Sequence, residues 1–167
     1  MKGVAMNHPF EPVYNEKSRI LILGSFPSVR SREEGFFYGH PQNRFWKVLA
    51  AVLGENVPQS IEAKRSFLWD HGIALWDVIA SCETEDSADV NIKNAVPNDL
   101  GIIFETANIQ YVFTNGRLAH TLYEKHIGKN AVYLPSTSPA NAAWSLERLT
   151  SAWKVIADQT IDMNSSI

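Results

Sequence analysis

Residues 19–46 read RILILGSFPSVRSREEGFFYGHPQNRFW, and the interpretation of the whole chain begins from this stretch. It opens with an uninterrupted apolar run, 20–23, that ends at Gly24. A run this short and aliphatic is typical of a strand buried on both faces, as in a parallel sheet. A polar and aromatic loop follows at once. Since ligands of open α/β sheets bind beyond the carboxyl ends of the strands, we expect the chemistry in this loop.

Three further apolar runs of strand length follow, and helical patterns separate them. The predicted strands are 73–79, 109–114 and 131–134; the predicted helices are 43–53, 60–71, 97–106, one after Asn115-Gly116, and 145–161 with Leu146, Leu149 and Trp153 facing inward. Buried strands that alternate with helices predict βαβ crossovers. We therefore expect a single α/β domain over residues 1–167, a three-layer α/β/α sandwich with a central four-stranded parallel sheet. Residues 1–18 and 81–96 are expected to be irregular.

Composition narrows the class of protein. The net charge is −3, so the overall charge gives no indication of a nucleic-acid partner. Basic residues are nevertheless concentrated around the first strand and its loop: Lys17, Arg19, Arg30, Arg32, Arg44 and Lys47. The single cysteine excludes an internal disulfide or a cysteine-only metal centre within one chain. No signal peptide and no run of about 20 apolar residues is seen. These features favour a soluble, cytoplasmic protein that does not contact membranes. We also expect it to be a monomer.

Two loops, 24–43 and 135–144, are predicted to leave the same edge of the sheet and to line one cleft. The first offers backbone N–H groups, aromatic rings, His40 and Asn43, although Asn43 also suits a plain helix N-cap. The second offers Ser136, Thr137, Ser138 and Asn141. Neither contains the paired carboxylates of a glycoside hydrolase, a zinc-spaced histidine pair or a phosphate-binding loop. We expect no metal and no cofactor.

Several segments carry a resemblance to a known family. GSFPS, FFYGHPQNRFWKV, TNGRLA and STSPAN together resemble the uracil-DNA glycosylase superfamily, and most closely its hypoxanthine-DNA glycosylase (DNA-deoxyinosine glycosylase) branch. The resemblance runs from about Phe10 to Ile156. It departs from sister branches at Phe26, which stands where they place a water-directing Asp or Asn. It departs again at Ser136, which stands where the classical uracil enzymes place a histidine.

The resemblance implies roles for individual residues. It makes Asn43 and Ser136 the catalytic candidates, and it makes Tyr38 the ring that stacks on an everted base, with Phe37 and Phe36 as alternatives. The remaining base-binding candidates are Gly24, Ser25, Phe26 and His40. The DNA-binding candidates are Arg30, Arg44, Ser138, Pro139, Ala140 and Asn141, the last of which would wedge into the duplex. Asp77 ends a strand near the same cleft, where a loop-capping role is at least as good an interpretation.

The expected function is therefore that of a monofunctional DNA glycosylase of base excision repair. It would act on double-stranded DNA that carries a deaminated base, with hypoxanthine preferred and uracil as a weaker or additional substrate. Two alternatives stay open on the sequence: a uracil or mismatch-specific glycosylase, because GHPQNRFW is shared with that branch, and a non-catalytic nucleic-acid-binding relative, because Phe26 cannot polarise water.

Overall fold

A central parallel sheet organises the computed structural model, which describes residues 4–8, 10–84 and 93–165. Its four strands are β2 (Ile20–Gly24), β3 (Ile73–Asp77), β6 (Tyr111–Asn115) and β7 (Ala131–Leu134), in the order β3-β2-β6-β7. All three neighbouring pairs are parallel. The prediction of a four-stranded parallel sheet is thereby confirmed, and the first predicted strand lies inside it.

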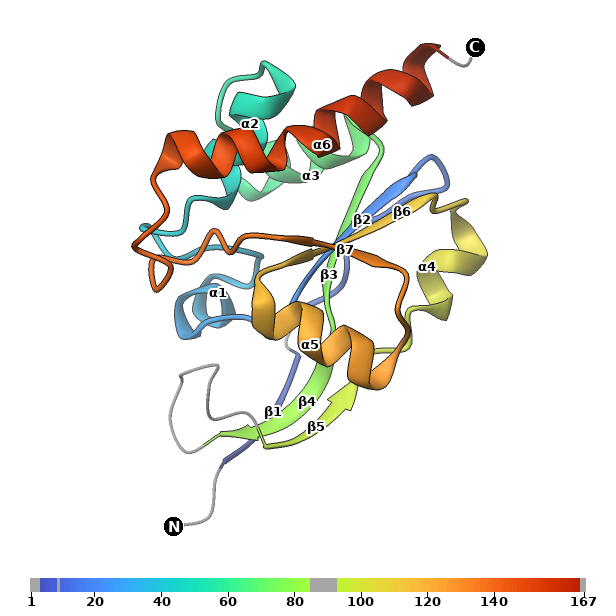
Figure 1. The fold of residues 1–167 in the computed structure, drawn as a ribbon. Coiled ribbons are helices and arrows are strands. Elements are labelled where there is room, and N and C mark those ends of the chain that lie inside the picture. Colours follow the sequence, from blue (N-terminus) through green and yellow to red (C-terminus); the bar gives the residue numbers. More distant parts are fainter. Residues whose placement is uncertain (1–3, 9, 85–92, 166–167) are drawn as a thin grey trace.

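Helices cover both faces of this sheet (Figure 1). On one side lie α2 (Phe45–Leu53), α3 (Ile61–Asp70) and α6 (Leu146–Ser165); on the other lie α1 (Val29–Glu34) and α5 (Arg117–His126). Strands β2 and β3 are buried at every position because they are covered on both sides. The inward-facing residues predicted for α6 are confirmed at Leu149 and Trp153, but the prediction is wrong at Leu146, which is 42% exposed.

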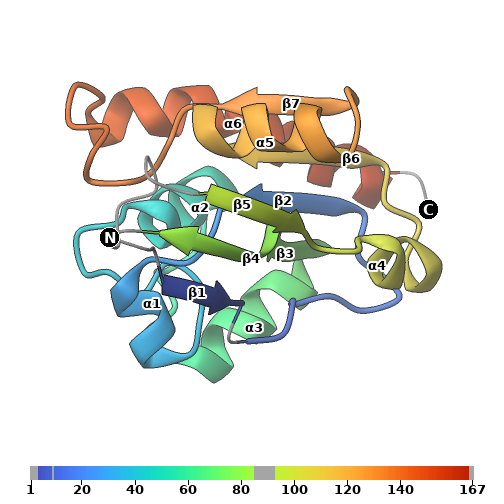
Figure 2. The ribbon, with the colours of Figure 1, turned by 90° about the horizontal axis from the view of Figure 1, so that it is seen from below.

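A second, smaller sheet corrects the sequence prediction (Figure 2). It is antiparallel, in the order β1-β4-β5, with β1 (Val4–Asn7), β4 (Ile79–Thr84) and β5 (Lys93–Pro97). Residues 1–18 and 81–96 were both expected to be irregular, yet each contributes strands; residues 85–92 lie outside the described residues. Strand β1 has only four residues, and its partner β4 lies far along the chain, so its own sequence gives no recognisable strand pattern. Strands β4 and β5 mix polar and apolar residues and therefore lack the continuous apolar run of a strand buried on both faces.

Other boundaries also differ from the prediction. The run at 73–79 breaks at Val78, and its last residue starts β4. Pro97 ends β5 rather than opening a helix, and helix α4 spans Gly101–Thr106. The loop expected at 24–43 contains the short helix α1, whose N-terminus is capped by Ser28 Oγ accepting from Ser31 N. In the described part of the chain, no helix is long and apolar enough to cross a bilayer.

The parallel arrangement brings the carboxyl ends of the central strands to one edge of the sheet. Gly24 at the end of β2 is in register with Asp77 at the end of β3. Asn115 at the end of β6 is in register with Leu134 at the end of β7. The two loops singled out by sequence start from this edge, so the fold places them opposite one another.

Candidate active site

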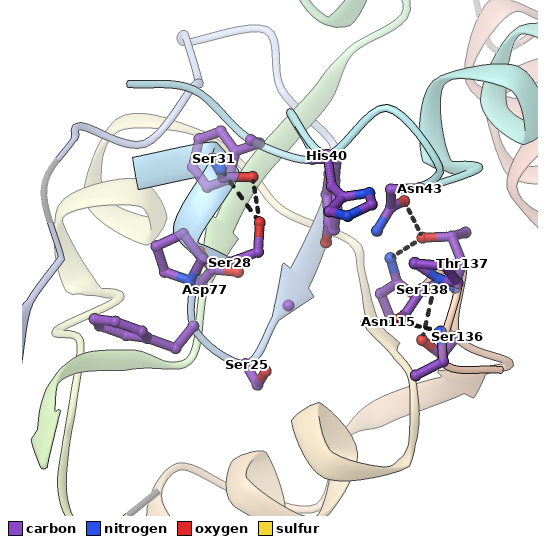
Figure 3. Close-up of a pocket in the computed structure, with 17 residues that line it drawn as sticks. Ser25, Ser28, Ser31, His40, Asn43, Asp77, Asn115, Ser136, Thr137 and Ser138 are labelled. Atoms are coloured by element: carbon purple, nitrogen blue, oxygen red, sulfur yellow. Dashed lines mark hydrogen bonds between the residues drawn. The ribbon is translucent and has the colours of Figure 1, made fainter. Parts of the chain in front are cut away.

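A pocket of about 360 Å³ lies at this edge, between the loop that follows β2 and the loop that follows β7. Figure 3 shows Ser28 and Ser31 on one side and Asn43, Thr137, Asn115 and Ser136 on the other. The lining residues are Gly24, Ser25, Phe26, Pro27, Ser28, Ser31, Phe37, Tyr38, His40, Asn43, Asp77, Asn115, Ser136, Thr137, Ser138, Pro139 and Ala140. Tyr38, Asn43 and Ser136 are each partly exposed, so the pocket is open to solvent.

The structure therefore brings together most of the residues that the sequence singled out. All the candidates for catalysis and base binding line the pocket, as do Ser138, Pro139 and Ala140. Arg44 and Asn141 do not line it. Arg30 belongs to α1, but its side chain lies outside the part of the chain that is described. Phe36 is also absent from the lining, because it is buried and stacked on Trp46.

The Asn43 amide has a defined orientation. Its Oδ1 accepts a hydrogen bond from Phe45 N at 2.9 Å and another from Thr137 Oγ1 at 2.9 Å. A backbone N–H can only donate, so the atom facing Phe45 is oxygen and the amide cannot be flipped. The Nδ2 group then points away from Thr137 and into the pocket (Figure 3). Asn43 thus presents hydrogen-bond donors to the pocket, while its acceptor is used within the protein.

The capping role that the sequence suggested for Asn43 is also seen. Helix α2 begins at Phe45, one residue later than an Asn43 N-cap would place it, and Arg44 is its formal cap. Asn43 Oδ1 nevertheless satisfies the N–H of Phe45, which has no partner within the helix. The Oδ1 atom of Asn43 therefore has a structural role, and the Nδ2 group is left to bind a ligand.

Thr137 connects Asn43 to the end of strand β6. It is fully buried, and its hydroxyl donates to Asn43 Oδ1 while accepting from Asn115 Nδ2 at 3.0 Å. Asn115 Oδ1 in turn accepts from Thr137 N at 3.1 Å. A hydroxyl has one hydrogen, so this arrangement fixes its direction. The relay from Asn115 through Thr137 holds the Asn43 amide in its orientation.

We expect Thr137→Val to weaken activity without displacing the loop. Valine has the same shape, but it leaves Asn115 Nδ2 without its acceptor and removes one of the two donors to Asn43. An unsatisfied buried group costs about 1–3 kcal/mol of folding stability. An Asn43 amide that is held by Phe45 N alone is less firmly oriented, which should lower kcat about tenfold. Thermal unfolding and single-turnover cleavage measure the two effects. Thr137→Ser keeps the hydroxyl and should restore both; equal loss in the serine and valine variants would contradict the relay.

The Tyr38 ring is held flat against the protein on one face. It stacks on Phe45 with ring centroids 4.1 Å apart and planes 15° apart. Since Tyr38 also lines the pocket, its opposite face is the one that a planar ligand can cover. The residue adopts a left-handed backbone conformation, with φ of +54°. Non-glycine residues in this region are uncommon and concentrate at functional sites.

Arg44 braces the second loop from the inside. Its guanidinium donates to the carbonyl oxygens of Ser138 and Asn141, each at 3.1 Å, and to that of Trp144. The Asn141 amide likewise donates to Ser136 O within the loop. These two residues were predicted to contact DNA. Their contacts here are internal, and they hold the wall that carries Ser136.

The basic cluster expected around the first strand is divided between two ends of the sheet. Lys17 and Arg19 precede β2 and therefore lie at its amino end, whereas the pocket is at its carboxyl end. Of the others, Lys47 is exposed and Arg32 lies over the Phe26 ring, 5.8 Å from its centroid. Lys17 and Arg19 therefore lie at the end of the sheet away from the pocket.

Asp77 and Asn115 end two of the parallel strands, and both line the pocket. The sequence placed Asp77 near the cleft without a settled role and did not single out Asn115, which the edge rule applied to every strand could have found. Ser28 and Ser31 also line the pocket without having been predicted as site residues. His8 contacts Asp77 from the end of β1, with Nε2 and Oδ2 2.8 Å apart. No sequence signal points to His8, because β1 was not predicted. Among the described residues, no group of three or more side chains is arranged to hold a metal ion.

Comparison with known proteins gives consistent results. The family model described as "Uracil DNA glycosylase superfamily" matches residues 11–159. A protein named hypoxanthine DNA glycosylase from Methanosarcina barkeri is 36% identical over 150 residues, covering 86% of this chain and 93% of the relative. Its namesake from Methanosarcina acetivorans is 35% identical over 152 residues, covering 88% and 95%.

A solved structure is similar across almost the whole chain. It is a solution NMR structure of a candidate uracil DNA glycosylase from Methanosarcina acetivorans. It superposes with a TM-score of 0.73 at 30% sequence identity, covering 92% of this chain and 99% of the other. The family model, which matches residues 11–159, spans both loops that form the pocket.

Proposed function

Because this chain belongs to the uracil DNA glycosylase superfamily and is a DNA glycosylase, we propose that it removes hypoxanthine from double-stranded DNA. Two relatives with the name hypoxanthine DNA glycosylase support this choice of base. The observation that carries the proposal is the Asn43 amide, which directs its Nδ2 donors into a pocket lined by a stacking ring. A target base reaches such a pocket only after it has been flipped out of the duplex.

Asn43 acts on the leaving base in this proposal. As the bond between C1′ and the base nitrogen breaks, the bonding electrons move onto the base. Water then adds to C1′, and the proton it releases neutralises the departed base. A donor that is already oriented stabilises the negative charge as it develops. Asn43 Nδ2 supplies such a donor, and the backbone N–H groups of the turn after Gly24 are proposed to assist. The Oδ1 atom is committed to Phe45 and Thr137, so Asn43 is not the residue that activates the water.

His40 and Ser136 can add further donors. The Nδ1 atom of His40 accepts from Gln42 N at 3.1 Å, so a neutral ring carries its hydrogen on Nε2. The Ser136 hydroxyl oxygen accepts from Ser138 N at 3.1 Å, which leaves the hydroxyl hydrogen to donate. Both side chains line the pocket and are partly exposed. We propose that they contact the base edge or the sugar–phosphate.

We expect Tyr38→Ala to weaken binding of the flipped base far more than Tyr38→Phe. Stacking on an aromatic ring is worth about 1–3 kcal/mol per base, so the alanine variant should lose roughly 10- to 100-fold in affinity. The measurement is the Kd for a duplex with an uncleavable hypoxanthine analogue. The phenylalanine variant keeps the ring against Phe45 and serves as the control. Equal affinities in all three proteins would remove Tyr38 from base binding.

A nicking assay tests the proposed function directly. Duplexes that carry one hypoxanthine, one uracil or only normal bases are incubated with the enzyme. Each reaction is then divided into two portions, and one portion is treated with alkali. None of the described pocket-lining residues is a lysine, so the enzyme is proposed to be monofunctional and strand breaks should need alkali. Cleavage at hypoxanthine supports the proposal. Cleavage at uracil alone would support the second candidate, a uracil glycosylase, which the similar NMR structure favours.

A further inference from the structure

A buried pair of titratable side chains, His8 and Asp77, lies at the floor of the pocket and takes no part in the reaction described so far. Each side chain is only 5% exposed. Asp77 is the sole acid among the described residues that line the pocket. His8 lies behind it, among the rings of Phe10, Phe26, Phe37 and Trp76.

The hydrogen bonds of His8 require a proton between the two side chains. His8 Nδ1 lies 2.8 Å from the carbonyl oxygen of Phe10, and a carbonyl only accepts, so Nδ1 carries a hydrogen. His8 Nε2 lies 2.8 Å from Asp77 Oδ2. Two bare lone pairs would repel at this distance. A hydrogen shared between Nε2 and Oδ2 satisfies both groups and leaves Oδ1 as an acceptor.

The second carboxylate oxygen, Asp77 Oδ1, remains available to a ligand. No described group donates a hydrogen bond to it. A methyl group added to Gly24 would lie 2.4 Å from Oδ1 and 2.9 Å from the Tyr38 hydroxyl oxygen, so both atoms approach the same point on the backbone. Oδ1 therefore lies near the hydroxyl end of the Tyr38 ring, where it can accept from the edge of a base that stacks on this ring.

Resting on the proposed function, we infer that Asp77, positioned by His8, selects bases that present a ring N–H at this edge. Hypoxanthine has N1–H and uracil has N3–H, and either can donate to a carboxylate oxygen. Adenine and cytosine carry a lone pair at the corresponding nitrogen, which the carboxylate repels. Guanine presents two adjacent donors, N1–H and the exocyclic amino group. Since His8 already binds Oδ2, only Oδ1 is left to accept from them, and one donor of guanine stays unpaired. The pair thus separates deaminated bases from their parents.

A substrate pair tests this inference in single-turnover cleavage. One duplex carries hypoxanthine, and the other carries 1-deazahypoxanthine, in which the N1–H is replaced by C–H. The wild-type enzyme should prefer hypoxanthine by about 10- to 100-fold, the range expected for a hydrogen bond to a charged group. In Asp77→Leu, the ratio of the two cleavage rates should fall to within about threefold of the ratio for the uncatalysed hydrolysis of the same two substrates. Comparing ratios between variants cancels the intrinsic difference between the substrates.

Conservative variants separate base selection from a structural role. In Asp77→Asn, the amide nitrogen can donate to an unprotonated His8 Nε2, so an oxygen still faces the pocket and a preference for N–H should remain. His8→Gln keeps a donor to Oδ2 and should retain the preference. His8→Phe fits the aromatic surroundings but leaves the carboxylate unpaired, and it should lose the preference.

The outcomes distinguish this inference from the proposed function. A wild-type enzyme that cleaves no hypoxanthine overturns the proposed function itself. An enzyme that cleaves hypoxanthine, with a folded Asp77→Leu variant of unchanged preference, overturns only the selection by Asp77. Should Asp77→Leu fail to show a cooperative thermal transition, the two His8 variants decide: an undiminished preference in His8→Phe contradicts the inference.

Discussion

Replacing Asn43 with alanine is expected to reduce single-turnover cleavage of hypoxanthine about 100- to 1,000-fold while the protein stays folded. Removing one oriented donor from a site of developing negative charge has effects of this size. The variant also loses the acceptor for Phe45 N and for Thr137 Oγ1. Loss of a helix-capping oxygen costs about 1 kcal/mol of stability. Cleavage rates and thermal unfolding midpoints, measured on the same preparations, separate the two consequences.

Asn43→Asp is the sharper variant because it keeps one function of the amide and removes the other. A carboxylate oxygen still accepts from Phe45 N and Thr137 Oγ1, so stability should match that of the wild type. The group that faces the pocket becomes an acceptor with negative charge, which opposes the charge on the departing base. We expect a loss at least as large as that of the alanine variant. An active Asn43→Asp enzyme would instead mean that residue 43 directs water, and the donor mechanism would be wrong.

The sequence was sufficient for the parts of the structure that local patterns determine. The run at 20–23 is apolar because β2 is buried at every position, and the strands at 20–24 and 131–134 were predicted to within a residue or two. Strand β7 is an edge strand of the sheet, and its Val132 and Tyr133 are exposed although its sequence is apolar. The edge rule for parallel sheets then brought Tyr38, Asn43 and Ser136 to one pocket, because the loops that follow those strands start from the same edge. The prediction depended on the topology and needed no knowledge of side-chain geometry.

What the sequence could not give depends on contacts between distant segments. Strand β1 is stabilised by pairing with β4, about 75 residues later, so its own residues show no strand pattern. His8 consequently looked like an isolated histidine. The role of Arg44 was also out of reach, since a basic residue next to a DNA-binding motif suggests phosphate contact, whereas its partners are carbonyls about 100 residues away. The orientation of the Asn43 amide likewise needs the position of Thr137.

Gly24→Ala is expected to abolish most activity, at least about 100-fold, because the residues around the pocket floor have to shift to admit the methyl group. The residue is not in the left-handed region, so alanine brings no conformational strain. Its methyl group would lie 2.4 Å from Asp77 Oδ1 and 2.9 Å from the Tyr38 hydroxyl. Neither atom can easily withdraw: His8 holds the carboxylate at 2.8 Å, and Phe45 backs the tyrosine ring. Single-turnover rates and the Kd for an uncleavable duplex measure the effect.

Gly54→Ala provides the matched control. At Gly54 an alanine is strained by the backbone conformation but meets no neighbouring atom, whereas at Gly24 it is unstrained but meets two. Gly54 has φ of +68° at the end of helix α2, and nothing lies within 4 Å of an added methyl group. Alanine there should cost about 1 kcal/mol of stability and leave cleavage unchanged. If Gly24→Ala is as active as Gly54→Ala, the floor of the pocket yields without consequence for the base. Tyr38 and Asp77 could not then be held in place as firmly as base selection requires.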